Sequence, residues 1–167
     1  MNDSQLNVHP STGSWVIDSA ASTFGFRAKA LFGMKVTGSF ERYESSINVG
    51  TDGPSSTVSV SVRADSVVTG SKKRDEHLRS SNVFAVTEFP TIEFTSTAVT
   101  PTADGIDLAG NLRVRDITKP VVLHATRFGD GHQYKAEVVV MPKEFGITRP
   151  GTGKPLTIVI DAVLRRI

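Results

Sequence analysis

The sequence predicts an all-β protein, either a closed antiparallel barrel or a sandwich of about eight strands. It holds 46 Val, Ile and Thr residues against 23 Leu, Met and Ala residues, and branching at Cβ suits a strand better than a helix. Apolar residues also recur at every second position, which is the period of a strand with one buried face. The length of 167 residues corresponds to one domain.

Composition and charge exclude several classes of protein. The chain has no cysteine, which excludes disulfides, thiolate catalysis and zinc thiolate sites. No apolar run exceeds four residues, as at residues 138–141, which is too short for a transmembrane helix. The net charge of +2 is a small imbalance and not a basic stripe, so we expect no nucleic-acid partner.

The first residues differ in character from the rest. Residues 1–13 are polar and without periodicity, so we predict a disordered N-terminal tail followed by one barrel domain over residues 14–167. This tail has neither the basic start nor the apolar stretch of a secretory signal, which predicts a cytoplasmic location.

The alternating segments follow one another along the domain, with Gly, Pro and Ser between them. Their expected inward faces are Phe24 and Phe26; Val36, Gly38 and Phe40; Val58, Val60, Val62 and Ala64; Ile92 and Phe94; Leu108, Gly110, Leu112 and Val114; Val121, Leu123 and Ala125; Val138 and Val140; and Ile158, Ile160, Ala162 and Leu164. Several of these residues are small. Small inward residues leave room along the axis, which favours a hollow barrel, because eight strands suffice to hold one ligand.

Residues 69–85 break the alternation and contain five consecutive charges at residues 72–76. We expect a helical turn or loop here, one of at most two short helical segments, pinned across an opening of the barrel by Leu78, Val83 and Phe84. Three cations in this stretch have open interpretations. Lys72, Arg74 and Arg79 form either a solvated face or a site for a ligand head group. Alternatively, Arg74 forms a structural ion pair with Asp75.

No catalytic motif emerges. The four histidines have no metal-binding spacing, and no Gly-x-Ser-x-Gly elbow is present. We therefore expect no enzyme activity, no metal and no cofactor.

Five stretches nevertheless carry a resemblance to a known family. They are Trp15-Val16-Ile17-Asp18 with Ser22 and Phe24-Gly25-Phe26; residues 36–40; residues 74–80 with Phe84 and residues 89–97; Gly110-Asn111-Leu112 through residues 118–121; and Phe145-Gly146-Ile147. In order and spacing they resemble the YceI-like family of lipid-binding proteins. Ala21 and Ala30 depart from it, since the family usually has histidine just before the position of Ser22 and often near Ala30.

The resemblance implies an eight-stranded antiparallel, lipocalin-like barrel. It also implies that the barrel binds, and sequesters or carries, an isoprenoid chain such as a polyprenyl phosphate or an isoprenoid quinone tail, or a similar long amphiphilic lipid. A homodimer is one state that the resemblance allows.

For such a ligand the inward faces supply the expected cavity lining. It consists of Phe24, Phe26, Val36, Phe40, Val60, Val62, Phe94, Leu112, Val114, Leu123, Val140 and Ile160. Phe32, Met34 and Phe84 are expected at the lip of the cavity, because flexible apolar side chains adapt to different ligands.

Two alternatives remain from the sequence. One is a stress-related or interaction protein whose barrel is filled by its own side chains, with an internal volume below about 300 Å³. The other is an enzyme that acts on a bound lipid, which requires titratable groups inside the barrel.

Overall fold

The computed structural model describes residues 10–31, 34–52, 55–129, 132–148 and 153–167. Strands dominate it, in agreement with the sequence. The elements are β1 (Gly13–Ile17), β2 (Thr23–Leu31), β3 (Met34–Phe40), β4 (Tyr43–Val49), β5 (Thr57–Arg63), η3 (Ala64–Ser66), β6 (Val67–Val68), α1 (Lys72–Arg79), β7 (Thr91–Pro101), β8 (Gly105–Val114), β9 (Ile117–Phe128), β10 (Gln133–Val140), η4 (Pro142–Phe145) and β11 (Leu156–Arg166).

Eight of these strands form a closed ring. Each pairs antiparallel with its neighbours in the order β1-β4-β5-β7-β8-β9-β10-β11, and β11 returns to β1. Trp15 is the closing residue, because it pairs with Arg166 on one side and with Ile47 on the other. The ring confirms a barrel and not a sandwich, and closure leaves no exposed edge at the seam.

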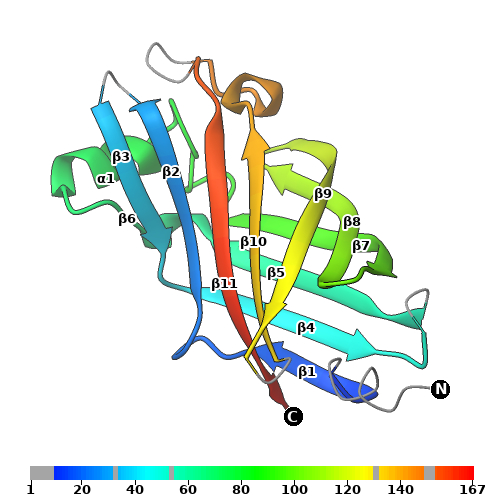
Figure 1. Cartoon of the computed structure of the whole chain (residues 1–167). Helices are drawn as coiled ribbons and strands as arrows, with labels where there is room; N and C mark the ends of the chain where they lie inside the picture. The colour runs from blue at the N-terminus through cyan, green and yellow to red at the C-terminus, as the bar shows by residue number, and fades with distance from the viewer. Residues whose placement is uncertain (1–9, 32–33, 53–54, 130–131, 149–152) are drawn as a thin grey trace.

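The remaining strands extend from β11 as a branch. The N-terminal half of β11 pairs with β2, so β1 and β2 occupy successive stretches of the same edge. β3 then pairs with β2, and the short β6 with β3. Figure 1 shows β2 and β3 beside β11, and the C-terminus at the bottom of the view, far from α1.

Helix α1 forms where the sequence predicted a helical turn. The Ser71 side chain accepts a hydrogen bond from the Arg74 amide at 3.3 Å, which caps the first turn. Asp75 is buried and accepts hydrogen bonds from the Thr69 amide and hydroxyl at 2.8 and 2.5 Å. Leu78 is 2% exposed. The helix is therefore held by the buried Leu78 side chain and by the hydrogen bonds between Asp75 and Thr69.

The end of the predicted tail lies against the barrel. The Arg166 guanidinium donates to the Ser11 hydroxyl and to the Thr12 carbonyl oxygen. The Trp15 indole donates to the Ser11 carbonyl oxygen at 2.8 Å. Residues 10–13, which the sequence placed in a disordered tail, therefore contribute to the seam, and Gly13 is the first residue of β1.

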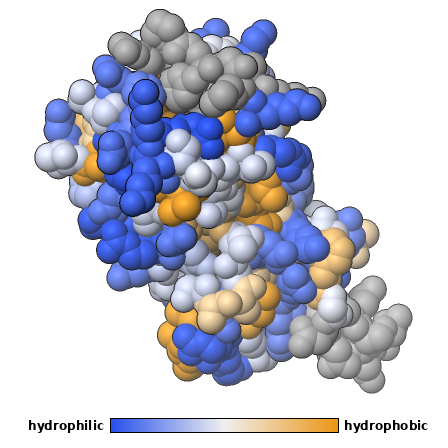
Figure 2. Space-filling view, turned by 90° about the vertical axis from the view of Figure 1, so that its left-hand side faces the viewer, coloured by the Kyte–Doolittle hydropathy of each residue, from blue (hydrophilic) through white to orange (hydrophobic). Residues whose placement is uncertain are grey.

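The outer surface is mixed in character. On the face drawn in Figure 2, hydrophobic residues lie in separate small areas between hydrophilic ones. The exposed large apolar side chains of the described residues are those of Val122, Phe128, Val139 and Ile167. Within the same part of the chain, no helix has the length and apolar character needed to cross a bilayer.

Candidate functional site

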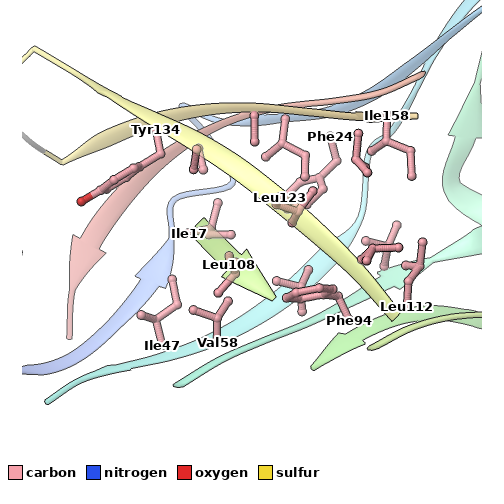
Figure 3. A pocket seen from close by; sticks show the side chains of 18 of the residues that line it. Ile17, Phe24, Ile47, Val58, Phe94, Leu108, Leu112, Leu123, Tyr134 and Ile158 are labelled. Atoms are coloured by element: carbon pink, nitrogen blue, oxygen red, sulfur yellow. The ribbon is translucent and has the colours of Figure 1, made fainter. Parts of the chain in front are cut away.

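The barrel encloses an apolar cavity of about 700 Å³. Its wall consists of inward side chains from all eight ring strands, with Ile17 as the contribution of β1. Side chains from β2, β3, α1 and the segments after α1 and β10 also line it. Figure 3 shows aliphatic and phenylalanine side chains converging on this space. The volume exceeds the limit of about 300 Å³ set for a filled barrel and falls within the range of about 300–1,000 Å³ typical of ligand sites.

Most of the residues expected to face inward border the cavity. All the expected lining residues lie on the wall except Val36. Val36 is 3% exposed and packs in the main core cluster. It belongs to β3, where Phe40 lies on the cavity wall, so the inward side chains of this one strand divide between the wall and the packed core.

Small inward residues do not all create free space. A Cβ atom on Gly38 would lie 2.5 Å from Cζ of Phe26, and one on Gly110 would lie 2.5 Å from Cζ of Phe94. The phenylalanine rings therefore occupy the room that the two glycines leave. Alanine provides part of the wall instead, at Ala125, Ala136 and Ala162.

One end of the cavity, here called the helical end, is apolar. Leu78 from α1, Val83 and Phe84 from the following segment, and Phe145 and Ile147 at η4 line it. Phe84 packs edge-on against Phe40 with ring centroids 5.8 Å apart.

The remaining lip candidates are only partly covered by the structure. Phe32 lies outside the described residues, and Met34 is the first residue of β3.

The three candidate head-group cations lie near α1 but not on the cavity wall. Arg74 donates to the hydroxyl and carbonyl oxygens of Thr69 at 2.8 and 2.7 Å. Arg79 donates to the carbonyl oxygens of Asp65 and Val67 at 2.9 and 3.2 Å. Both guanidinium groups thus hold the backbone that leads into the helix, and Lys72 is exposed. Arg74 has Thr69 and not Asp75 as its partner.

The opposite end of the cavity, here called the hairpin end, is where β9 finishes at Phe128 and β10 begins at Gln133. Polar residues from the N-terminal segment, from the end of β4 and from the region between β4 and β5 enter the lining here, among them Ser11, Asn48 and Asp52. Tyr134 also lines this end and is 8% exposed. Burial raises the pKa of Tyr134 above 10, although the neighbouring Arg127 acts in the opposite direction.

The sequence of this barrel matches the profile of a known family. The sequence profile of the YceI-like domain matches residues 15–164. The chain belongs to the YceI-like family.

Curated relatives agree with this assignment. Over 132 residues, this YceI-like chain is 34% identical to Protein YceI of Salmonella newport strain SL254. The alignment covers 74% of this chain and 69% of the relative. Protein YceI of Salmonella arizonae gives the same figures.

Solved structures share the fold at low sequence identity. Burkholderia cenocepacia BcnA superposes with a TM-score of 0.78 at 14% identity, covering 89% of this chain and 99% of that protein. A polyisoprenoid binding domain from Saccharophagus degradans gives a TM-score of 0.67 at 13% identity, covering 90% and 98%. The Campylobacter jejuni YceI protein gives 0.60 at 19% identity, covering 78% and 84%.

Ala21 and Ala30, where the YceI-like family usually or often has histidine, can be placed in the fold. Ala21 is exposed in the turn between β1 and β2, where its amide donates to the Asp18 carbonyl oxygen. Ala30 belongs to β2. Across the described ranges, no group of three or more His, Cys, Asp or Glu side chains is placed to hold a metal ion.

Sequence reasoning missed the polar hairpin end of the YceI-like barrel. Residues 133–140 contain Tyr134 and Ala136 two positions apart, which is the strand period. The same alternation places Tyr134 and Ala136 on the inward face of Val138 and Val140, nearer the turn. It was hard to recognise because residues 138–140 are apolar on both faces of the strand.

Proposed function

We propose that this protein binds one long-chain apolar or amphiphilic lipid, such as a polyisoprenoid or an isoprenoid quinone, inside the barrel and sequesters or carries it. The observation that carries the proposal is the apolar cavity of about 700 Å³ along the barrel. The polyisoprenoid-binding description of the Saccharophagus degradans domain, which shares the fold, supports the same ligand class.

The driving force is the removal of the ligand chain from water. Each CH₂ group moved into an apolar wall contributes about 0.8 kcal/mol. A tail of about twenty carbons therefore gains on the order of 10 kcal/mol after ordering costs. We assign the contacts to the phenylalanine and aliphatic side chains on the wall, including Phe24, Phe94 and Ile160.

We propose binding and not catalysis. Among the described residues, the titratable side chains on the cavity wall are those of Asp52 and Tyr134. Because its pKa is raised by burial, Tyr134 stays protonated at neutral pH. An acid–base pair that could act on a bound lipid needs two groups with suitable pKa values close together, and these two residues come from opposite sides of the ring.

Native mass spectrometry of freshly purified protein, followed by organic extraction, tests the proposal. We expect one apolar molecule per chain and uptake of a fluorescent prenyl probe by the stripped protein. The variant Ala136→Phe places a ring in the cavity and should weaken probe uptake. Its matched control is Val139→Phe on the outer face of the same strand, where Val139 is 63% exposed.

Two results would contradict the proposal. One is a purified protein that carries no apolar molecule and takes up no prenyl probe. The other is equal probe uptake by Ala136→Phe and Val139→Phe. A cytoplasmic location and a homodimeric state stay predictions from the sequence, tested by cell fractionation and by size-exclusion chromatography with light scattering.

A further inference from the structure

The two ends of the cavity differ in polarity, and this difference bears on how a ligand is oriented. The helical end presents Leu78, Val83, Phe84, Phe145 and Ile147, and no hydrogen-bonding side chain enters that set. Figure 3 shows Tyr134 at one edge of the labelled side chains, with its hydroxyl oxygen directed away from them. An amphiphile gains most when its tail meets the apolar end and its head group meets the polar end.

Tyr134 has a cationic neighbour on the adjacent strand. In the ladder between β9 and β10, Tyr134 lies directly opposite Arg127. Residues directly opposite in an antiparallel pair project from the same face of the sheet. Arg127 therefore follows Ala125 on the inward side of β9, one step nearer the end of the barrel and just beyond the residues that border the cavity.

Arg127 carries a donor that the described residues leave unused. Its Nη1 atom is buried and has no hydrogen-bond partner among them. A buried guanidinium donor without an acceptor costs free energy. The ion pairs found in the described part of the chain do not include Arg127.

Arg166 and Asp104, two other charged residues at the hairpin end, have hydrogen-bond partners within the protein. Arg166 donates to Ser11 and Thr12 and stacks on Trp15, with its guanidinium carbon 5.7 Å from the ring centroid. The Asp104 carboxylate accepts from the Thr102 hydroxyl at 3.2 Å, while the backbone carbonyl of Asp104 accepts from the Arg127 amide at 2.8 Å.

Asp52 lies on the opposite wall. It belongs to the segment between β4 and β5, which are separated from β9 and β10 by β7 and β8 in one direction and by β1 and β11 in the other. Its carboxylate accepts from the Ser55 amide at 2.9 Å.

We propose that Arg127 and Tyr134 form the head-group site of the cavity, and that this site receives an anionic oxygen group, a phosphate or a carboxylate, while the tail extends toward the helical end. This inference rests on the proposed function. Guanidinium and phenol both donate to oxygen, and a guanidinium binds phosphate or carboxylate in a planar fork. The raised pKa of Tyr134 keeps its hydroxyl a donor at neutral pH.

The test compares three probes with the same prenyl tail: geranylgeranyl phosphate, geranylgeranoic acid and geranylgeraniol. Calorimetric titration of the full chain, stripped of bound lipid, measures Kd for each probe. We expect at least one anionic probe to bind more tightly than the alcohol, and the ratio of phosphate to carboxylate affinity identifies the preferred anion.

Variants then locate the site. Arg127→Met should weaken anionic probes by about tenfold to a hundredfold and leave the alcohol within a factor of about three. Tyr134→Phe should weaken them less, since it removes one neutral donor and keeps the ring. Arg127→Lys keeps the charge without the fork and should fall between wild type and Arg127→Met.

The matched control is Lys135→Met, which removes the same charge from an exposed position on β10 whose ammonium lies over the Phe128 ring. It should bind all three probes like the wild type. Circular dichroism checks the fold of every variant, and Tyr134→Phe supplies the comparison if Arg127→Met does not fold.

Each other outcome overturns the inference. If all three probes bind equally and Arg127→Met changes none of them, the head-group site is wrong while the proposed function stands. If Lys135→Met weakens the anionic probes as much as Arg127→Met, the preference is a general charge effect. If no prenyl probe binds, the proposed function fails and this inference fails with it.

Discussion

Gly110 offers a direct test of how tightly the cavity wall is packed. An ideal Cβ atom at this position would lie 2.5 Å from Cζ of Phe94 and 2.5 Å from the Thr95 carbonyl oxygen. The Phe94 ring borders the cavity and has free space to move into. The Thr95 oxygen belongs to the backbone of β7, whose ladder with β8 holds it in place.

We expect Gly110→Ala to destabilise the fold. Crowding of this kind costs about 1–3 kcal/mol. The alanine offsets about 0.4–1 kcal/mol of that cost by restricting the unfolded chain. The net loss of about 1–2 kcal/mol corresponds to a fall in Tm of about 2–8 °C for a domain of this size.

Thermal and urea denaturation followed by circular dichroism measure the change. Gly153→Ala is the matched control, because no atom lies within 4 Å of the Cβ position there; it should be neutral or slightly stabilising. The double variant Gly110→Ala/Phe94→Leu separates the two contacts, since it relieves the ring but not the backbone oxygen.

Lipid uptake provides a second measurement on the same variant. If the Phe94 ring swings inward, the cavity shrinks and probe binding weakens. A Gly110→Ala protein as stable as Gly153→Ala, with unchanged uptake, would refute the assignment of Gly110 as the space beneath the ring.

Three further perturbations follow from the described contacts. Asp75→Ala leaves the half-buried donors of Thr69 without their acceptor and should cost about 1–3 kcal/mol in urea denaturation, whereas the exposed Glu76→Ala should stay within about 0.5 kcal/mol; similar values for both would contradict the role assigned to the hydrogen bonds between Asp75 and Thr69. Leu78→Ala should cost about 2–5 kcal/mol, against a small change for Val122→Ala at a 47% exposed position. Burial raises the pKa of Tyr134 above its usual value of 10.0; the folded state then retains the proton more firmly, so its stability should fall as the pH rises above about 10. Tyr134→Phe should flatten that part of the stability profile, and a profile identical to wild type counts against the buried hydroxyl.

Local pattern and spatial arrangement contributed differently to the candidate site. The strand period predicted which side chains face inward, because successive side chains alternate between the two faces whatever the strand pairs with. Phe24, Phe94 and Leu123 could therefore be assigned to the interior from the sequence alone. The alternation could not distinguish cavity wall from packed core. Val36 and Phe40 are both inward residues of β3, yet Phe40 borders the cavity and Val36 does not.

The charged residues show the same division. A run of cations within α1 is visible in the sequence, but the partners of Arg74 and Arg79 are carbonyl oxygens that only the folded chain brings within reach. Conversely, nothing local distinguishes Arg127 from any other arginine near a turn. Its place opposite Tyr134 results from the register of β9 and β10.

By itself, then, the sequence determined the class of fold, the family and the inward faces, all of which depend on short-range periodicity and on residues at set spacings. Tertiary structure alone decided that a cavity remains, that phenylalanine rings fill the space beside Gly38 and Gly110, and which end of the cavity is polar. These features depend on distances between side chains from strands far apart in the chain. Such distances are set by ring closure and register, which no local pattern encodes.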